Sequence, residues 1–171
     1  LMAKEILSEA RYSLRKDNIP HCEKIETGIM IEIPSAALIS DKLAGEVNFF
    51  SIGSNDLVQY TLAVDRGNAR ISHLYQPCHP SVLKLIKMTI DNGIRAGIWT
   101  GICGEMASIP EIACLLVGLG AEELSMAPVA IPSVKEKLRR MEGQELKNLA
   151  AEAMLFNNHE EVLGFLQKKI R

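Results

Sequence analysis

The apolar positions along this chain follow two spacings that alternate. Short apolar runs typical of buried strands are each followed by a segment whose apolar residues recur every three or four positions, as in a helix. The predicted strands are residues 28–33, 47–52, 98–103 and 123–127. The helices predicted to follow them begin at Pro34, Asp56, Pro80, Pro110 and Pro132, with proline suited to a first helical turn. Strands that alternate with helices predict an α/β fold with a parallel sheet and right-handed crossovers.

At both ends of the chain the sequence predicts helices without strands. Apolar residues at helical spacing predict a helix over residues 2–16. After residue 141 two further helices are predicted, 143–156 and 158–170, with Asn157 and Asn158 between them as a stop and a cap. We therefore divide the chain into residues 1–141, which carry the sheet, and 142–171, a C-terminal helical extension of the same domain.

Composition excludes several classes of protein. The chain has 171 residues, 47% of them hydrophobic, which suits one globular domain. Nineteen basic residues against twenty-one acidic ones give a net charge of −2, without the basic stripe typical of nucleic-acid binding. The longest apolar stretches fall short of the roughly 20 residues of a membrane span, and no signal-peptide pattern opens the chain. We therefore expect a cytoplasmic protein without membrane insertion.

The four cysteines show no metal-binding pattern. They form no C-x-x-C pair and have no histidine at metal-ligand spacing, which argues against zinc. A reduced thiol in a cytosolic protein is usually a small buried hydrophobe, which is our expectation for Cys22, Cys78 and Cys114. Cys103 differs, because it lies near glycines at the end of a predicted strand.

Polar side chains collect where the predicted strands end. They are Glu32, Asn55, Asp56, Cys103 and Glu105. The carboxyl ends of parallel strands are where α/β folds place their functional groups. Taken alone, Glu32 fits an exposed loop as well as a site, and Asn55 and Asp56 are favoured as helix N-caps on spacing.

The two carboxylates together suggest a metal. Glu32 and Asp56 follow consecutive strands, and neighbouring strands lie only about 5 Å apart. Carboxylates that close repel each other unless a proton or a cation lies between them. Oxygen ligands of this kind suit Mg²⁺, which takes one or two carboxylates and completes its coordination with water and substrate phosphate. We therefore expect Mg²⁺ at this edge.

Arg66 and Cys103 each have an ordinary and a functional interpretation. Arg66 lies ten residues after Asp56; a solvated surface arginine is the commoner case, but beside a metal and a phosphate it would bind phosphoryl oxygens in a bidentate manner. Cys103 is either a buried structural residue or a general acid, since an ordinary thiol is mostly protonated at neutral pH.

Two segments, "GIMIEIPSAALISDKLAGEVNFFSIGSNDLVQYTLAVDRGNARISHLYQP" and "WTGICGEMASIP", resemble a known family. This is the phosphoenolpyruvate-binding domain of Enzyme I, the phosphoenolpyruvate–protein phosphotransferase of the bacterial sugar phosphotransferase system. The resemblance covers about residues 27–140. Pyruvate phosphate dikinase and phosphoenolpyruvate synthase share the "IE-x-P", "G-[ST]-N-D-[LM]" and "CGE" patterns, whereas "QYTLAVDRGN" is closer to Enzyme I.

The resemblance implies a fold and a role for each candidate residue. The fold is the second half, strands five to eight, of a TIM (β/α)8 barrel with a C-terminal helical tail. Glu32 and Asp56 would ligate Mg²⁺, while Asn55 and Asp56 would contact phosphoenolpyruvate and Arg66 would bind its phosphoryl group. Cys103 would protonate the methylene carbon of the enolate as pyruvate forms. In the family, the phosphoryl group passes to a histidine on a separate domain and then to the carrier protein HPr.

Other family features have no counterpart in this sequence. The phosphohistidine domain and the first half of the barrel are absent, none of the four histidines matches the phosphorylated motif, and Ser54 replaces a common threonine. We therefore expect part of a longer enzyme, inactive alone, that forms a homodimer because a half barrel exposes strand edges. Two alternatives stay open: a fragment of a dikinase or synthase, and a non-catalytic half-barrel module for binding or dimerisation.

Overall fold

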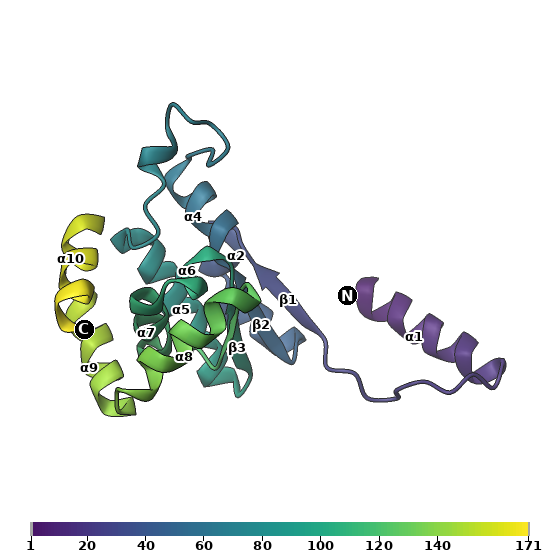
Figure 1. The fold of residues 1–171 in the computed structure, drawn as a ribbon. Helices are drawn as coiled ribbons and strands as arrows, with labels where there is room; N and C mark the ends of the chain where they lie inside the picture. The colour runs from purple at the N-terminus through teal and green to yellow at the C-terminus, as the bar shows by residue number, and fades with distance from the viewer. Residues whose placement is uncertain (1, 171) are drawn as a thin grey trace.

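Four parallel strands form the sheet at the centre of the chain. The structure, a computed structural model, describes residues 2–170. The strands are β1 (Gly28–Ile31), β2 (Phe49–Gly53), β3 (Trp99–Cys103) and β4 (Glu123–Ser125), and they lie in chain order (Figure 1). Each pairs in parallel with the next. The predicted α/β class and parallel sheet are confirmed.

Helices connect the strands at most of the predicted positions. They are α2 (Pro34–Leu38), α3 (Ser40–Leu43), η1 (Ala44–Glu46), α4 (Ser54–Leu62), η2 (Ser72–Leu74), α5 (Pro80–Ala96), α6 (Glu105–Ser108), α7 (Pro110–Leu119), η3 (Pro128–Ala130) and α8 (Ile131–Arg139). The single helix predicted after Pro34 is wrong, because the backbone breaks at Ile39 between α2 and α3. Over residues 2–170, no helix combines the length and the apolar character needed to cross a membrane.

The sheet buries one face and leaves the other open. Ile31, Phe50, Ile52 and Ile102 point to the covered face and are at most 1% exposed. The helix α5 lies against β2 and β3 on this face, and its Leu83, Ile86 and Ile90 are buried as predicted. The opposite side, which we call the open face, carries Met30, Phe49, Ser51, Trp99, Cys103 and Glu123. Met30 there is 47% exposed, so a parallel sheet that normally needs cover on both faces has it on one.

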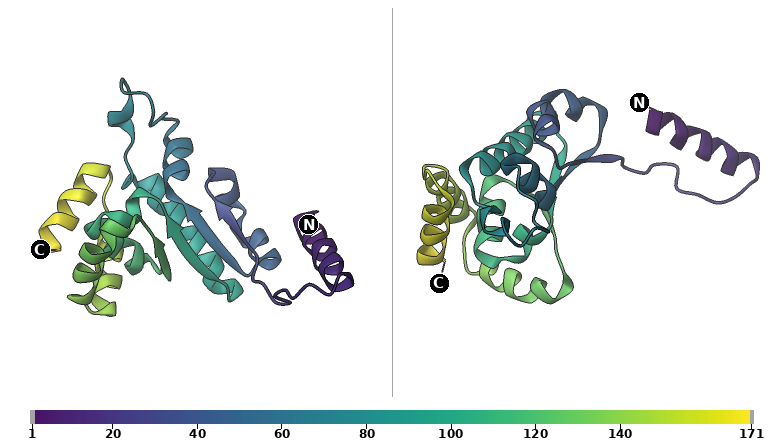
Figure 2. Two further views of the ribbon diagram at one scale, coloured as in Figure 1. Left: turned by 45° about the vertical axis from the view of Figure 1, so that its right-hand side comes forward. Right: turned by 90° about the horizontal axis from the view of Figure 1, so that it is seen from above.

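The C-terminal helices pack outside this layer. They are α9 (Gly143–Ala153) and α10 (His159–Lys169), and α9 lies against α7 (Figure 2). Gly118 permits this approach, because a Cβ on it would lie 2.1 Å from the carbonyl oxygen of Leu146 in α9. Asn158 caps α10 as predicted, since its side chain accepts a hydrogen bond from the backbone N–H of Glu161 at 2.8 Å.

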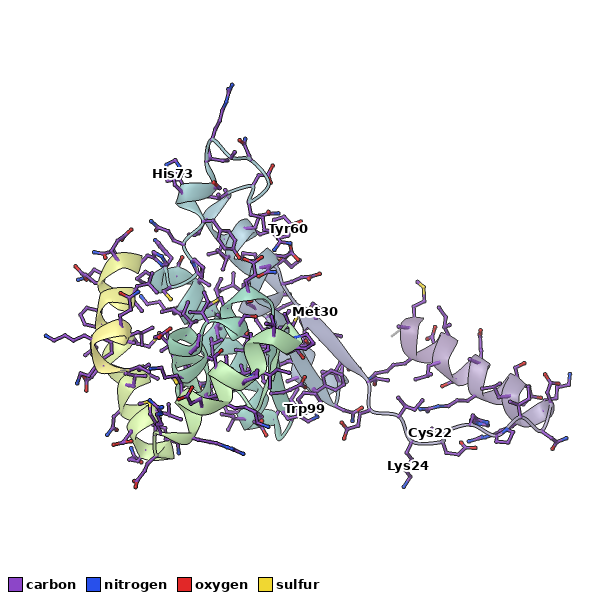
Figure 3. All side chains as sticks on the ribbon, viewed as in Figure 1. Cys22, Lys24, Met30, Tyr60, His73 and Trp99 are labelled. Atoms are coloured by element: carbon purple, nitrogen blue, oxygen red, sulfur yellow. The ribbon has the colours of Figure 1, made fainter. Side chains whose placement is uncertain are left out.

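The N-terminal helix α1 (Met2–Lys16) has the predicted bounds but stands apart from the sheet (Figure 1). None of its described residues is buried, and an extended segment joins it to β1. Cys22 lies in that segment and is exposed (Figure 3), so the expectation that it is buried is wrong. The segment contacts α1 through the Arg15–Glu23 ion pair but has no place in the hydrophobic core. Cys78 and Cys114 are buried as expected, and burial raises their pKa to about 12 and about 11.

Candidate functional site

The predicted polar residues meet at one edge of the sheet. Glu32 follows β1, Asn55 and Asp56 lie in the first turn of α4 after β2, Cys103 ends β3, and Glu105 begins α6. Because all four strands are parallel, these ends lie on the same side. We call this edge, with the first turns of α4 and α6, the rim.

The two candidate metal ligands lie on the β1–β2 side of the rim. Glu32 leans over the end of β2, because a Cβ on Gly53 would lie 2.9 Å from its carboxylate oxygen Oε2. Asp56 follows three residues after Gly53, in the first turn of α4, where the partial positive charge of the helix N-terminus favours a carboxylate. Neither carboxylate forms an ion pair with another side chain of residues 2–170. Both are therefore available to an external cation.

Two carboxylates suit Mg²⁺ better than a metal ion that takes all of its ligands from protein side chains. Within residues 2–170 no group of three or more His, Cys, Asp or Glu side chains is placed to hold an ion. Magnesium needs only one or two carboxylates and takes the rest of its ligands from water and phosphate. Glu32 and Asp56 supply two carboxylates, the number that such a site would use.

The interpretation of Asn55 and Asp56 as N-caps of their own helix is wrong. The helix α4 begins at Ser54, directly at the end of β2, so Gly53 occupies the cap position and no side chain caps it. The side-chain carbonyl oxygen of Asn55 instead accepts a hydrogen bond at 2.9 Å from the backbone N–H of Glu105, the first residue of α6. Asn55 thus holds the start of a different helix, across the rim.

A second hydrogen bond joins the same two segments. The Ser54 hydroxyl donates to the carbonyl oxygen of Cys103 at 2.7 Å. Between Cys103 and α6, Gly104 has a φ of +116°, and a Cβ there would lie 2.4 Å from the Ser54 hydroxyl oxygen. Glycine is therefore required for the close packing of α4 against the β3–α6 connection. A pocket of about 370 Å³ opens at this junction, lined in part by Asn55, Gly104 and Glu105.

Tyr75 is a rim residue that the sequence did not predict. Its hydroxyl donates a hydrogen bond to the backbone carbonyl of Asn55 at 3.4 Å. Its pKa is raised to about 12, first by burial, then by the carboxylate of Glu105 and less by that of Asp56, while Arg66 acts in the opposite direction. Arg66, Glu105 and Asp56 therefore lie within electrostatic reach of one hydroxyl. Arg66 lies in the exposed loop after α4, where its backbone N–H donates to the side-chain oxygen of Gln59 at 3.2 Å.

Cys103 is accessible from the open face. Its sulfur lies 3.6 Å from the carbonyl oxygen of Ile52 and 3.9 Å from both the Ser51 hydroxyl oxygen and the Met30 sulfur. Unlike Cys78 and Cys114, it is only partly buried. A small molecule on the open face could therefore reach this thiol.

Comparison with known proteins assigns the family. Residues 1–143 match the profile of a family described as PEP-utilising enzyme, PEP-binding domain. The chain belongs to this family. It is 46% identical over 166 residues to the phosphoenolpyruvate-protein phosphotransferase of Listeria monocytogenes, which covers 97% of this chain and 29% of that protein. The protein of the same name from Haemophilus influenzae is 48% identical over 151 residues, covering 88% of this chain and 26% of its own length. The chain thus spans less than a third of these relatives.

The family assignment confirms the resemblance found in the sequence motifs. A third relative of the same name, from Borreliella burgdorferi, is 46% identical over 164 residues, which is 96% of this chain and 29% of that protein. The match therefore extends beyond the motif region into the C-terminal helices. All three relatives are named as protein phosphotransferases, and none of the three as a dikinase or a synthase.

Proposed function

We propose that this chain is the phosphoenolpyruvate-binding portion of a phosphoenolpyruvate–protein phosphotransferase. The observation that carries the proposal is the placement of two unpaired carboxylates, Glu32 and Asp56, on the same rim as the accessible thiol of Cys103. A substrate whose anionic group is bound through a metal at Glu32 and Asp56 would have its opposite end near the thiol of Cys103. Membership of the family and the names of the relatives support the same substrate.

The binding roles follow from the chemistry of each group. Glu32 and Asp56 would hold Mg²⁺, which when bound offsets negative charge on the phosphoryl oxygens. Arg66 would bind the phosphoryl group through its guanidinium. The side-chain carbonyl oxygen of Asn55 already accepts the N–H of Glu105, so its amide NH₂ is the part left to donate to substrate. Placement and charge stabilisation are the main requirements of phosphoryl transfer.

Cys103 would act on the enolate that remains after the phosphoryl group has left. Loss of the phosphoryl group leaves the enolate of pyruvate, whose methylene carbon must take up a proton. The thiol of Cys103, which is only partly buried at the end of β3, would supply it.

The rest of the enzyme would lie outside this chain. In the family, the phosphoryl group goes to a histidine of a separate domain and then to HPr. The histidines of this chain, His21, His73, His79 and His159, belong to the segment after α1, η2, the α5 cap and α10 rather than to the rim. We therefore expect the chain alone to lack phosphotransferase activity. We also infer a half (β/α)8 barrel, a homodimer and a cytoplasmic location, the first two supported by the open face and the free edges of β1 and β4.

Replacement of Cys103 by alanine in the full-length enzyme tests the proposal. Pyruvate formation from phosphoenolpyruvate should fall by about 10²–10⁴-fold, the usual contribution of a general acid, while Mg²⁺ affinity is retained. Cys22→Ala is the matched control, because Cys22 is an exposed thiol remote from the rim. Retained turnover with lost metal affinity would show that Cys103 has a different role.

A non-catalytic module for binding or dimerisation is the second candidate, favoured by the exposed Met30 and the partly buried Phe49 and Trp99 of the open face. Calorimetric titration with Mg²⁺ and phosphoenolpyruvate separates the two. A catalytic portion should bind phosphoenolpyruvate only with Mg²⁺ present and lose that binding in Asp56→Asn. A purely structural module should show no metal-dependent binding.

A further inference from the structure

The thiol of Cys103 has three neighbours that could influence its proton. In parallel register Cys103 lies opposite Gly53 of β2, and Ser51 lies two residues earlier on the same face of that strand. Ser51 therefore reaches the sulfur diagonally, while Met30 approaches from β1. The third neighbour is the backbone carbonyl of Ile52. Met30, labelled in Figure 3, belongs to the open face by the register of β1 and β2.

These neighbours have different effects before and after proton transfer. When Cys103 protonates the methylene carbon, its S–H bond breaks and the proton bonds to carbon through the electron pair of the enolate double bond. The enolate oxygen becomes the keto oxygen of pyruvate, and the negative charge moves to sulfur. The carbonyl of Ile52 and the thioether of Met30 can only accept hydrogen bonds, so neither stabilises a thiolate. The Ser51 hydroxyl is the one donor among the three.

Ser51 has no competing role in the strand. Within residues 2–170, the hydroxyl of Ser51 forms one hydrogen bond, which it donates to the sulfur of Cys103. A hydroxyl on an otherwise apolar strand, directed at the proposed acid, would act where charge develops. Such preorganised donors lower the barrier of a step that creates an anion.

We propose that Ser51 is a positioning residue for Cys103: its hydroxyl donates to the sulfur and stabilises the thiolate left after the enolate is protonated. This inference rests on the proposed function. A hydrogen bond to a charged group corresponds to a factor of about 10 to 100 in rate.

The first test uses turnover in the full-length enzyme. Ser51→Ala should lower kcat for pyruvate formation by about 10-fold to 100-fold and leave the KM for phosphoenolpyruvate unchanged. Ser51→Thr should restore kcat, because it keeps the hydroxyl, and β-branched residues suit a strand. A KM that rises while kcat is unchanged, or a threonine variant as slow as alanine, would overturn the inference.

The second test does not depend on turnover. Alkylation of each cysteine by iodoacetamide at one fixed neutral pH can be followed by mass spectrometry. Ser51→Ala should slow modification of Cys103 by several-fold, because the sulfur loses its hydrogen-bond donor, while the exposed Cys22 reacts at its usual rate and the buried Cys78 stays unreactive. Ser125→Ala is the matched control: Ser125 lies opposite Cys103 on β4, but its hydroxyl donates to Glu123.

The outcomes separate the inference from the proposed function. An unchanged rate of Cys103 alkylation in Ser51→Ala, or equal slowing in Ser125→Ala, overturns the role of Ser51 even if Cys103 is essential. A Cys103→Ala enzyme that forms pyruvate at the unmodified rate overturns the acid role of Cys103 in the proposed function, and the catalytic role of Ser51 with it, even if Ser51 controls alkylation.

Discussion

Gly104 connects the proposed acid Cys103 to the helix α6, whose first N–H is held by Asn55. Its φ of +116° is a conformation that side chains rarely adopt, and an added Cβ would lie 2.8 Å from the side-chain oxygen of Asn55. At residue scale, the packing of the rim therefore requires glycine at this position.

Gly104→Ala should lower the free energy of unfolding of the chain by about 1–3 kcal/mol, because both the backbone and the contact with Asn55 are strained. Urea denaturation gives the measurement. Gly164→Ala is the control, since Gly164 lies inside α10 and a Cβ added to it would meet no atom within 4 Å; it should stabilise the chain by up to about 1 kcal/mol. Equal effects of the two substitutions would contradict the role given to Gly104.

Individual site residues differ in how far the sequence could predict them. Glu32 and Cys103 could be found because each comes at the end of an apolar run, and the end of a parallel strand is a functional position. The bond from Asn55 to α6 could not be found, because it joins residues 50 positions apart. Tyr75 could not be found for the same reason: its place at the rim depends on how the long loop after α4 folds back.

At element scale, the C-terminal helix α10 forms hydrogen bonds with residues 76–78, which connect the long loop after α4 to α5. The backbone N–H of Cys78 donates to Nδ1 of His159 at 3.1 Å, and the side chain of Gln76 donates to Glu160 at 3.2 Å. His159 can accept this bond only as neutral imidazole. Burial lowers the pKa of His159 below its ordinary value of 6.5, with Glu160 opposing and His79 adding to the effect.

This arrangement predicts a loss of stability in mild acid. A lowered pKa in the folded chain means that the unfolded chain binds the proton first as pH falls. The contribution of His159 to stability is therefore present above about pH 6.5 and declines as pH falls below that value through the folded pKa. Urea midpoints at neutral and mildly acidic pH should show a smaller decrease for His159→Gln than for the unmodified chain. His73→Gln, on exposed η2, should keep the full decrease.

Whole elements were predicted well where the pattern was local and less well where tertiary contacts decide. The bounds of α1 and the start of α5 follow from spacing and proline alone. The break between α2 and α3 does not, because it serves a buried pair: Ser40 donates to the carbonyl of Ala37 and accepts from Asn92 of α5, both at 2.8 Å. The short helix α6 was also missed, since its first N–H is capped by a residue from another strand's connection.

At the scale of the whole molecule, the sheet lacks cover on its open face, although a parallel sheet normally has both faces covered. Phe49 and Trp99 stack on it with ring centroids 4.3 Å apart, and Met30 is 47% exposed on the same face. The two outer strands, β1 and β4, each have one unpaired edge within the sheet. Parallel sheets are stable when both faces are covered, and unpaired edges favour association with another chain.

We therefore expect the isolated chain to form a homodimer through this side of the sheet. Light scattering at micromolar concentration should give twice the mass of one chain. Met30→Lys should shift the equilibrium toward monomer, because burying its unpaired charge in an apolar contact is costly. Leu155→Lys is the matched control: Leu155 is an 80% exposed apolar residue just after α9, away from the sheet, and its replacement should leave the dimer intact. A compact monomer of the unmodified chain would contradict the prediction and would imply that one chain tolerates the open face in water.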